Sequence, residues 1–142
     1  MNPTLKTSAR ARILAAAILS GALGIGTAFA ADVKVTLSGA NEVPPVTTAA
    51  SGGGTITIGA DGSVSGSVST KGIVSTKAHI HLAAPGKNGP VIVPLTKDGD
   101  TYKVPAGAKL TEAQMASFKA GDLYINVHSA AHPGGEIRGQ LK

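Results

Sequence analysis

The chain has 142 residues, of which 42% are hydrophobic, and it contains 19 glycines, 8 prolines and no cysteine or tryptophan. This length suits one domain, and the absence of cysteine excludes disulfide scaffolds, thiol nucleophiles and thiolate metal sites. The formal net charge is +5, but three basic residues and none of the acidic ones lie in the first thirty positions, so the remainder is nearly neutral. A nearly neutral chain with few aromatic residues is not typical of nucleic-acid-binding proteins.

The first thirty residues are typical of a secretion signal. Lys6, Arg10 and Arg12 form a basic start, an apolar run covers 13–26, and Ala-Phe-Ala at 28–30 is a small-x-small cleavage site. The apolar run is shorter than the roughly 20 residues that span a bilayer. We therefore expect residues 1–30 to be cleaved, leaving residues 31–142 as a single periplasmic or secreted domain with no membrane attachment. The alternative is that this segment is a buried N-terminal helix.

Apolar and polar residues alternate through most of the remaining chain, which indicates half-buried β-strands. The pattern covers 33–37, 55–58, 64–68, 73–82, 91–93, 122–129 and 136–141, with Gly- or Pro-rich turns between these runs. Asp61-Gly62 is the strongest hairpin signal. Segment 111–120 lies between a capping Thr111 and Gly121 and predicts one short helix. We predict an all-β, antiparallel Greek-key or immunoglobulin-like β-sandwich with one short helix near 111–120.

All four histidines fall into two short windows, 79–81 and 128–132. Residues two apart on a strand share a face, so His79 and His81 point away from the apolar face of their strand. By the same rule, His128 points away from the apolar face of the last long strand. If the two strands are neighbours, these three side chains can bind one metal ion, with His132 from the following turn as a candidate fourth ligand.

The donor set indicates which metal would bind. Imidazole ligands, with Glu42, Glu136 or water as a candidate further ligand, suit Cu(II) or Zn(II). Met115 is the only methionine after the predicted signal, and there is no cysteine, so a soft site for Cu(I) is disfavoured. We therefore expect a copper ion first and a zinc ion second. The alternative is that the histidines are ordinary surface groups that hydrogen-bond loop carbonyls.

Three charged residues are candidates for a structural role. Glu42 precedes the rigid pair Pro44-Pro45, while Glu136 and Arg138 lie two apart on one predicted strand face. We expect a carboxylate–guanidinium ion pair that fixes a loop onto the sheet, with substrate binding as the alternative. The sequence contains no nucleophile-elbow motif and no phosphate-binding glycine motif. We therefore predict no catalytic residues, and a binding module is favoured over an enzyme.

Several stretches resemble the CHRD domain, a module named after the developmental regulator chordin and also found alone in exported bacterial proteins. They are LSGANEVPP at 37–45, AHIH at 78–81 with NGP at 88–90, AGDLYINVH at 120–128, and PGGEIRGQL at 133–141. The resemblance extends from about Val33 to Leu141 and implies an immunoglobulin-like β-sandwich. It implies no particular activity, because most bacterial members have none established. The growth-factor binding of chordin does not carry over to an exported bacterial domain.

A fainter similarity is to copper–zinc superoxide dismutase, a Greek-key sandwich with an H-x-H pair on an outward strand face. His79 and His81 look like that pair, and His128 looks like its late-strand copper ligand. This chain lacks the cysteines and the zinc-binding loop of that enzyme. The similarity therefore implies a mononuclear copper site rather than dismutase activity.

Three functions agree with these patterns. The leading hypothesis is an exported binding module with a histidine-rich site for copper or, second, zinc. The alternatives are a metal-free structural or interaction domain and a minimal redox metalloenzyme of dismutase type. The sequence indicates no protein partner.

The mature protein should begin at Ala31, because the small-x-small site ends at Ala30. The intact mass of the protein secreted by an exporting host measures this directly. A main species that retains residues 1–30 would contradict the export hypothesis.

Overall fold

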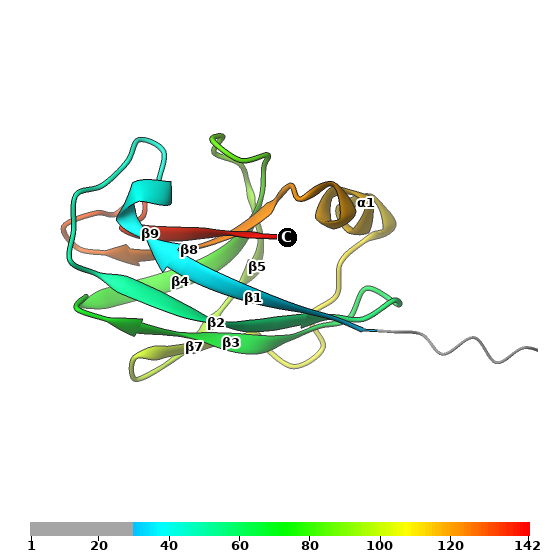
Figure 1. The fold of residues 1–142 in the computed structure, drawn as a ribbon. Helices are drawn as coiled ribbons and strands as arrows, with labels where there is room; N and C mark the ends of the chain where they lie inside the picture. The colour runs from blue at the N-terminus through cyan, green and yellow to red at the C-terminus, as the bar shows by residue number, and fades with distance from the viewer. Residues whose placement is uncertain (1–29) are drawn as a thin grey trace, which may run out of the picture.

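Nine antiparallel strands form one sheet that rolls into a nearly closed barrel in the computed structural model, which describes residues 30–142 (Figure 1). Their order across the sheet is β5-β4-β8-β9-β1-β2-β3-β7-β6. The predicted all-β antiparallel fold with one short helix is confirmed, whereas the predicted secretion signal lies outside the described residues apart from Ala30. The elements are β1 (Ala31–Ser38), the 3-10 helix η1 (Gly39–Asn41), β2 (Ser51–Ile58), β3 (Val64–Lys71), β4 (Ser75–Leu82), β5 (Val91–Pro94), β6 (Thr96–Asp98), β7 (Thr101–Lys103), α1 (Glu112–Ala120), β8 (Leu123–Ser129) and β9 (Ile137–Leu141).

The two ends of the sheet meet because its edge strands, β5 and β6, are consecutive in the chain and separated by Leu95 alone. The backbone N–H of Leu95 donates to the carbonyl oxygen of Ala78 on β4 at 3.0 Å. Lys97 on β6 donates to the carbonyl oxygen of Ser75, also on β4. One strand, β4, therefore holds both β5 and the start of β6, and this contact closes the barrel.

Alternation along the strands fills the interior of the barrel with apolar side chains. Each such side chain contributes roughly 1.5–3 kcal/mol to stability when it leaves water. Because the period of a strand is two residues, this burial also determines which residues face outward. Core residues with 0% exposure include Leu37 on β1, Ile56 on β2, Val68 on β3, Ile125 on β8 and Leu141 on β9.

β8 differs from the other strands because all seven of its residues are buried. Its apolar residues face the core, and its outward residues are covered by two connecting segments. The segment between β4 and β5 reaches Tyr124, whose hydroxyl accepts the backbone N–H of Gly89. The turn between β8 and β9 reaches Asn126 and His128, which bond to its backbone carbonyls. The outward face of β8 is therefore a buried polar surface.

The predicted helix is present as α1, and its ends have the expected caps. The Thr111 hydroxyl accepts the backbone N–H of Gln114, and the Gln114 side chain accepts the backbone N–H of Thr111. Gly121 ends the helix with a left-handed φ of 81°. Met115 and Phe118 pack against the core. In the described part of the chain, no helix combines the length and the apolar character needed to cross a membrane.

The predicted hairpin is confirmed, one predicted strand is shorter than expected, and one hairpin was missed. The hairpin at Asp61-Gly62 joins β2 to β3, and Gly62 has the positive φ of 85° that such a turn requires. The predicted strand at 73–82 begins only at Ser75, because the preceding residues form a turn in which Val74 is 89% exposed. The hairpin β6–β7 was not predicted, because its two three-residue strands are too short and polar to show alternation.

Candidate metal centre

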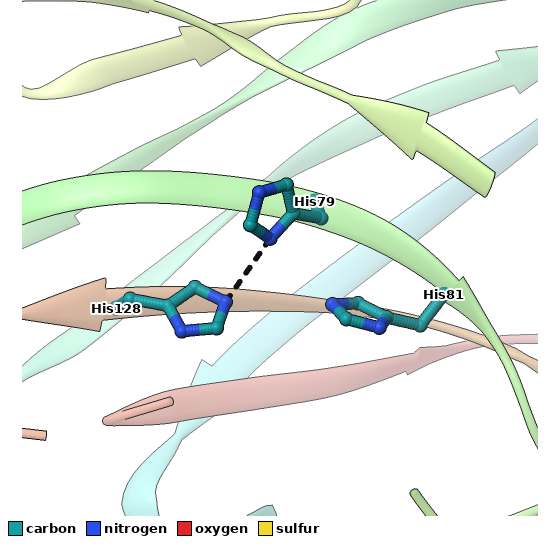
Figure 2. Close-up of side chains that lie close together, drawn as sticks. All are labelled: His79, His81 and His128. Atoms are coloured by element: carbon teal, nitrogen blue, oxygen red, sulfur yellow. Dashed lines mark hydrogen bonds between the residues drawn. The ribbon is translucent and has the colours of Figure 1, made fainter. Parts of the chain in front are cut away.

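Three of the four histidines come together on the outer side of the sheet (Figure 2). His79 and His81 lie on β4 and His128 on β8, and these two strands are antiparallel neighbours. The register pairs His79 with Asn126 and His81 with Tyr124, so His128 reaches its two partners diagonally. One ligand nitrogen from each of the three rings lies within 4.8 Å of the others. The convergence predicted from alternation is therefore present.

Backbone carbonyls determine which nitrogen each buried ring offers. The Nδ1 atom of His81 is 2.9 Å from the carbonyl oxygen of Gly89, and Nδ1 of His128 is 2.8 Å from that of Pro133. A carbonyl oxygen can only accept, so each Nδ1 carries the hydrogen and each Nε2 carries a lone pair. The Nε2 atom of His81 is buried and has no hydrogen-bond partner. This is the tautomer and orientation that a metal ligand needs.

The third ring, His79, completes the site. Its Nδ1 lies 3.1 Å from Nε2 of His128, and this contact is a hydrogen bond (Figure 2). Two nitrogens at this separation could both bind one ion with metal–nitrogen bonds of about 2.0–2.1 Å. The group contains three imidazoles and no carboxylate among the described residues.

The surroundings of the rings favour their neutral form. Burial is the main cause that lowers the pKa of His79 to about 4, and the nearby charges of His128, His81 and Lys77 add to this shift. Burial is also the main cause that lowers the pKa of His128. A neutral imidazole is the form that binds a metal ion. The folded protein therefore keeps these two imidazoles neutral at pH values below the usual pKa of histidine.

An aromatic stack supports His81 from behind. Its ring lies 4.7 Å from the Tyr124 ring, and the two planes differ by 4°. The guanidinium carbon of Arg138 lies 3.4 Å from the centre of the same Tyr124 ring. The Tyr124 hydroxyl accepts the N–H of Gly89, whose carbonyl holds His81. His81 is thus fixed both by its ring face and by its Nδ1 atom.

His132 does not join the three histidines, although it was a candidate fourth ligand. Its carbonyl oxygen accepts the N–H groups of Ser129 and Gly135, and its own N–H donates to the Ser129 hydroxyl. These bonds close a tight turn, and His132 lines a separate surface pocket together with Glu42. The contribution of this turn to the site is the carbonyl oxygen of Pro133.

The expected direct ion pair between Glu136 and Arg138 is absent from the described structure, because each side chain has other partners. Glu136 accepts the hydroxyls of Thr48 and Ser129, and the Ser129 bond is the main cause that lowers its pKa. Arg138 is 1% exposed and donates to the segment between β4 and β5. The two residues therefore hold different loops.

Glu42 is also buried, and one of its oxygens has no hydrogen-bond partner. Burial raises the pKa of Glu42, while the nearby Arg138 charge opposes that rise. Glu42 lies in the covering loops rather than among the metal-ligand candidates.

The parts of the site that sequence reasoning missed are mostly backbone atoms. The carbonyls of Gly89 and Pro133 orient two rings, yet a carbonyl has no residue-specific signal. Tyr124 was identifiable as a neighbour, since alternation places it on the same face of β8 as His128.

Comparison with protein families matches residues 33–141 to the CHRD domain. Comparisons with curated proteins and with solved structures give no match. The match agrees with the stretches of sequence that resemble this domain. It includes β4, β8 and all three histidines of the group.

The free energy of unfolding of the metal-free protein should rise with pH between about 4 and 6.5. In this window the unfolded chain binds a proton at His79 and the folded protein does not, so unfolding takes up protons. Urea midpoints of chelator-treated protein across this range measure the slope. His79→Asn should flatten it, and the control His132→Asn should not. Equal slopes in all three proteins would show that His79 is not the group responsible.

Replacing Arg138 by alanine should lower the free energy of unfolding by about 3–5 kcal/mol, because it removes a buried charge that opposes the charge of the buried Glu42 carboxylate. The carbonyl oxygen of Lys87 and the side-chain oxygen of Asn88 also lose their donor. Lys34→Ala removes an exposed charge from β1 and should change stability by less than about 0.5 kcal/mol. Denaturant unfolding measures both, and similar small effects would mean that Arg138 is not structurally required.

Proposed function

This chain belongs to the CHRD domain family, and we propose that it is an exported binding module that holds one divalent transition-metal ion. The ligands are His79, His81 and His128. The observation that carries the proposal is the buried Nε2 atom of His81, which has no partner and points toward the other two rings (Figure 2). A buried polar atom without a partner costs roughly 1–3 kcal/mol. A bound ion uses that lone pair.

Copper is the proposed ion, with zinc second. Three neutral imidazoles are borderline ligands that suit Cu(II) and Zn(II), and divalent affinities generally favour copper. The group offers no thiolate or thioether, which are the ligands that select Cu(I). Two of the three rings are already oriented by carbonyl groups, which reduces the cost of ordering them on binding.

Export is part of the same proposal and is supported by the pattern of residues 1–30. The basic start, apolar run and small-x-small site are the three parts of a secretion signal. A periplasmic or secreted location follows from that pattern.

A metal-free structural domain is the second candidate, and one observation favours it. The hydrogen bond between His79 and His128 satisfies two of the three ring nitrogens without an ion. In that case the histidines serve only to hold the covering loops.

Titration of the signal-free, tag-free protein with Cu(II) should show one saturable site, measured by calorimetry. His79→Ala, His81→Ala and His128→Ala should each weaken binding by at least about 100-fold, because two imidazoles hold an ion poorly. Zinc should bind more weakly than copper.

His132→Ala is the matched control, because it removes a histidine that lies outside the group. This variant should bind Cu(II) as the unmodified protein does. Absence of one-to-one binding, or binding that the three alanine variants leave unchanged, would support the metal-free domain instead.

A further inference from the structure

Lys77 lies on the same face of β4 as His79 and His81, because the three residues are two apart along one strand. Lys77 also pairs with His128 across to β8 in the strand register. Its side chain is exposed. The strand positions therefore place an ammonium group next to the candidate metal ligands.

The charge of Lys77 acts on the site. It contributes to the lowered pKa of both His79 and His128, after burial as the main cause. The charged groups that act on these two rings are histidines and Lys77, and none of them is a carboxylate. Three neutral imidazoles leave the charge of a divalent ion uncompensated. With the ion bound, the site would carry this charge together with that of Lys77.

The three histidines are not equally covered. His81 and His128 are 8% and 5% exposed, whereas His79 is only partly buried. The most exposed of the three histidines is therefore the one that lies two residues from Lys77 on the same strand face. Three protein ligands also leave at least one position of a four-coordinate ion for an external group. Because two of the three histidines are buried, a small external group is favoured over a large one.

We propose that the open coordination position of the bound ion takes a small anion, and that Lys77 attracts and holds this anion. This inference rests on the proposed metal site and names the class of ligand for that site. One donor atom of the anion coordinates the ion. The Lys77 ammonium attracts the negative charge of the anion. No proton or electron transfer is involved.

Azide is a suitable probe, because its binding to Cu(II) is visible by absorption and by electron paramagnetic resonance. The copper-loaded protein should bind azide saturably. Lys77→Gln should weaken azide binding about five-fold, the size expected for one nearby charge at a protein surface. Lys77→Arg keeps the charge and should restore most of the affinity. Lys34→Gln removes an exposed charge on β1 and should have no effect.

Affinity for Cu(II) provides a second readout with the opposite sign. Lys77→Gln should bind Cu(II) more tightly than the unmodified protein, because one positive charge that repels the ion is lost. Raising the salt concentration should reduce both effects of the substitution, because salt screens exposed charges. A damaged fold would instead weaken copper and azide binding together.

The outcomes separate the two proposals. If the unmodified protein does not bind Cu(II), the proposed function fails and this inference fails with it. If Cu(II) binds but azide does not, the anion site is wrong and the metal site stands. If Lys77→Gln binds azide as tightly as the unmodified protein, or binds Cu(II) less tightly, Lys77 does not have the proposed role.

Discussion

The buried guanidinium of Arg138 holds the outer side of the barrel together. It lies against the Tyr124 ring and donates to Asn88 and to the carbonyl oxygen of Lys87, which brings the segment between β4 and β5 onto the sheet. The same segment contributes the Gly89 carbonyl that orients His81. An arginine on β9 therefore controls the position of an imidazole on β4, although the two side chains belong to different strands. Without this interaction, the segment that covers Tyr124 on β8 would lose its buried anchor.

The turn between β8 and β9 is held in a comparable way from the other side. Glu136 accepts hydroxyls from Thr48 and Ser129, and these bonds hold the turn beside the loop that follows β1. The turn then places the carbonyl of Pro133 against His128. Two loops, each anchored by a buried charged residue, therefore orient two of the three imidazoles. Such support before binding is what distinguishes a preformed site from a chance cluster of histidines.

Alternation was sufficient to predict the antiparallel fold, the hairpin at Asp61-Gly62 and the faces of His79, His81 and His128, because a strand has a fixed period of two. It did not predict the partners of outward polar residues. Glu136 and Arg138 share a strand face, yet their partners lie in loops whose paths depend on the whole fold. His132 lies only a few residues after β8, but the hydrogen bonds of its turn keep it away from the other three histidines. Local periodicity specifies the direction of a side chain, whereas loop contacts depend on tertiary packing.

The separation of the histidines in the chain has a consequence for folding. His79 and His128 are 49 positions apart, and joining them requires closure of a long loop, which costs chain entropy. An ion that binds both residues in the folded form would raise stability by mass action and act as a reversible cross-link. The chain has no cysteine with which to form a disulfide. Its resistance to unfolding would then depend on the supply of metal rather than on the redox conditions of its surroundings.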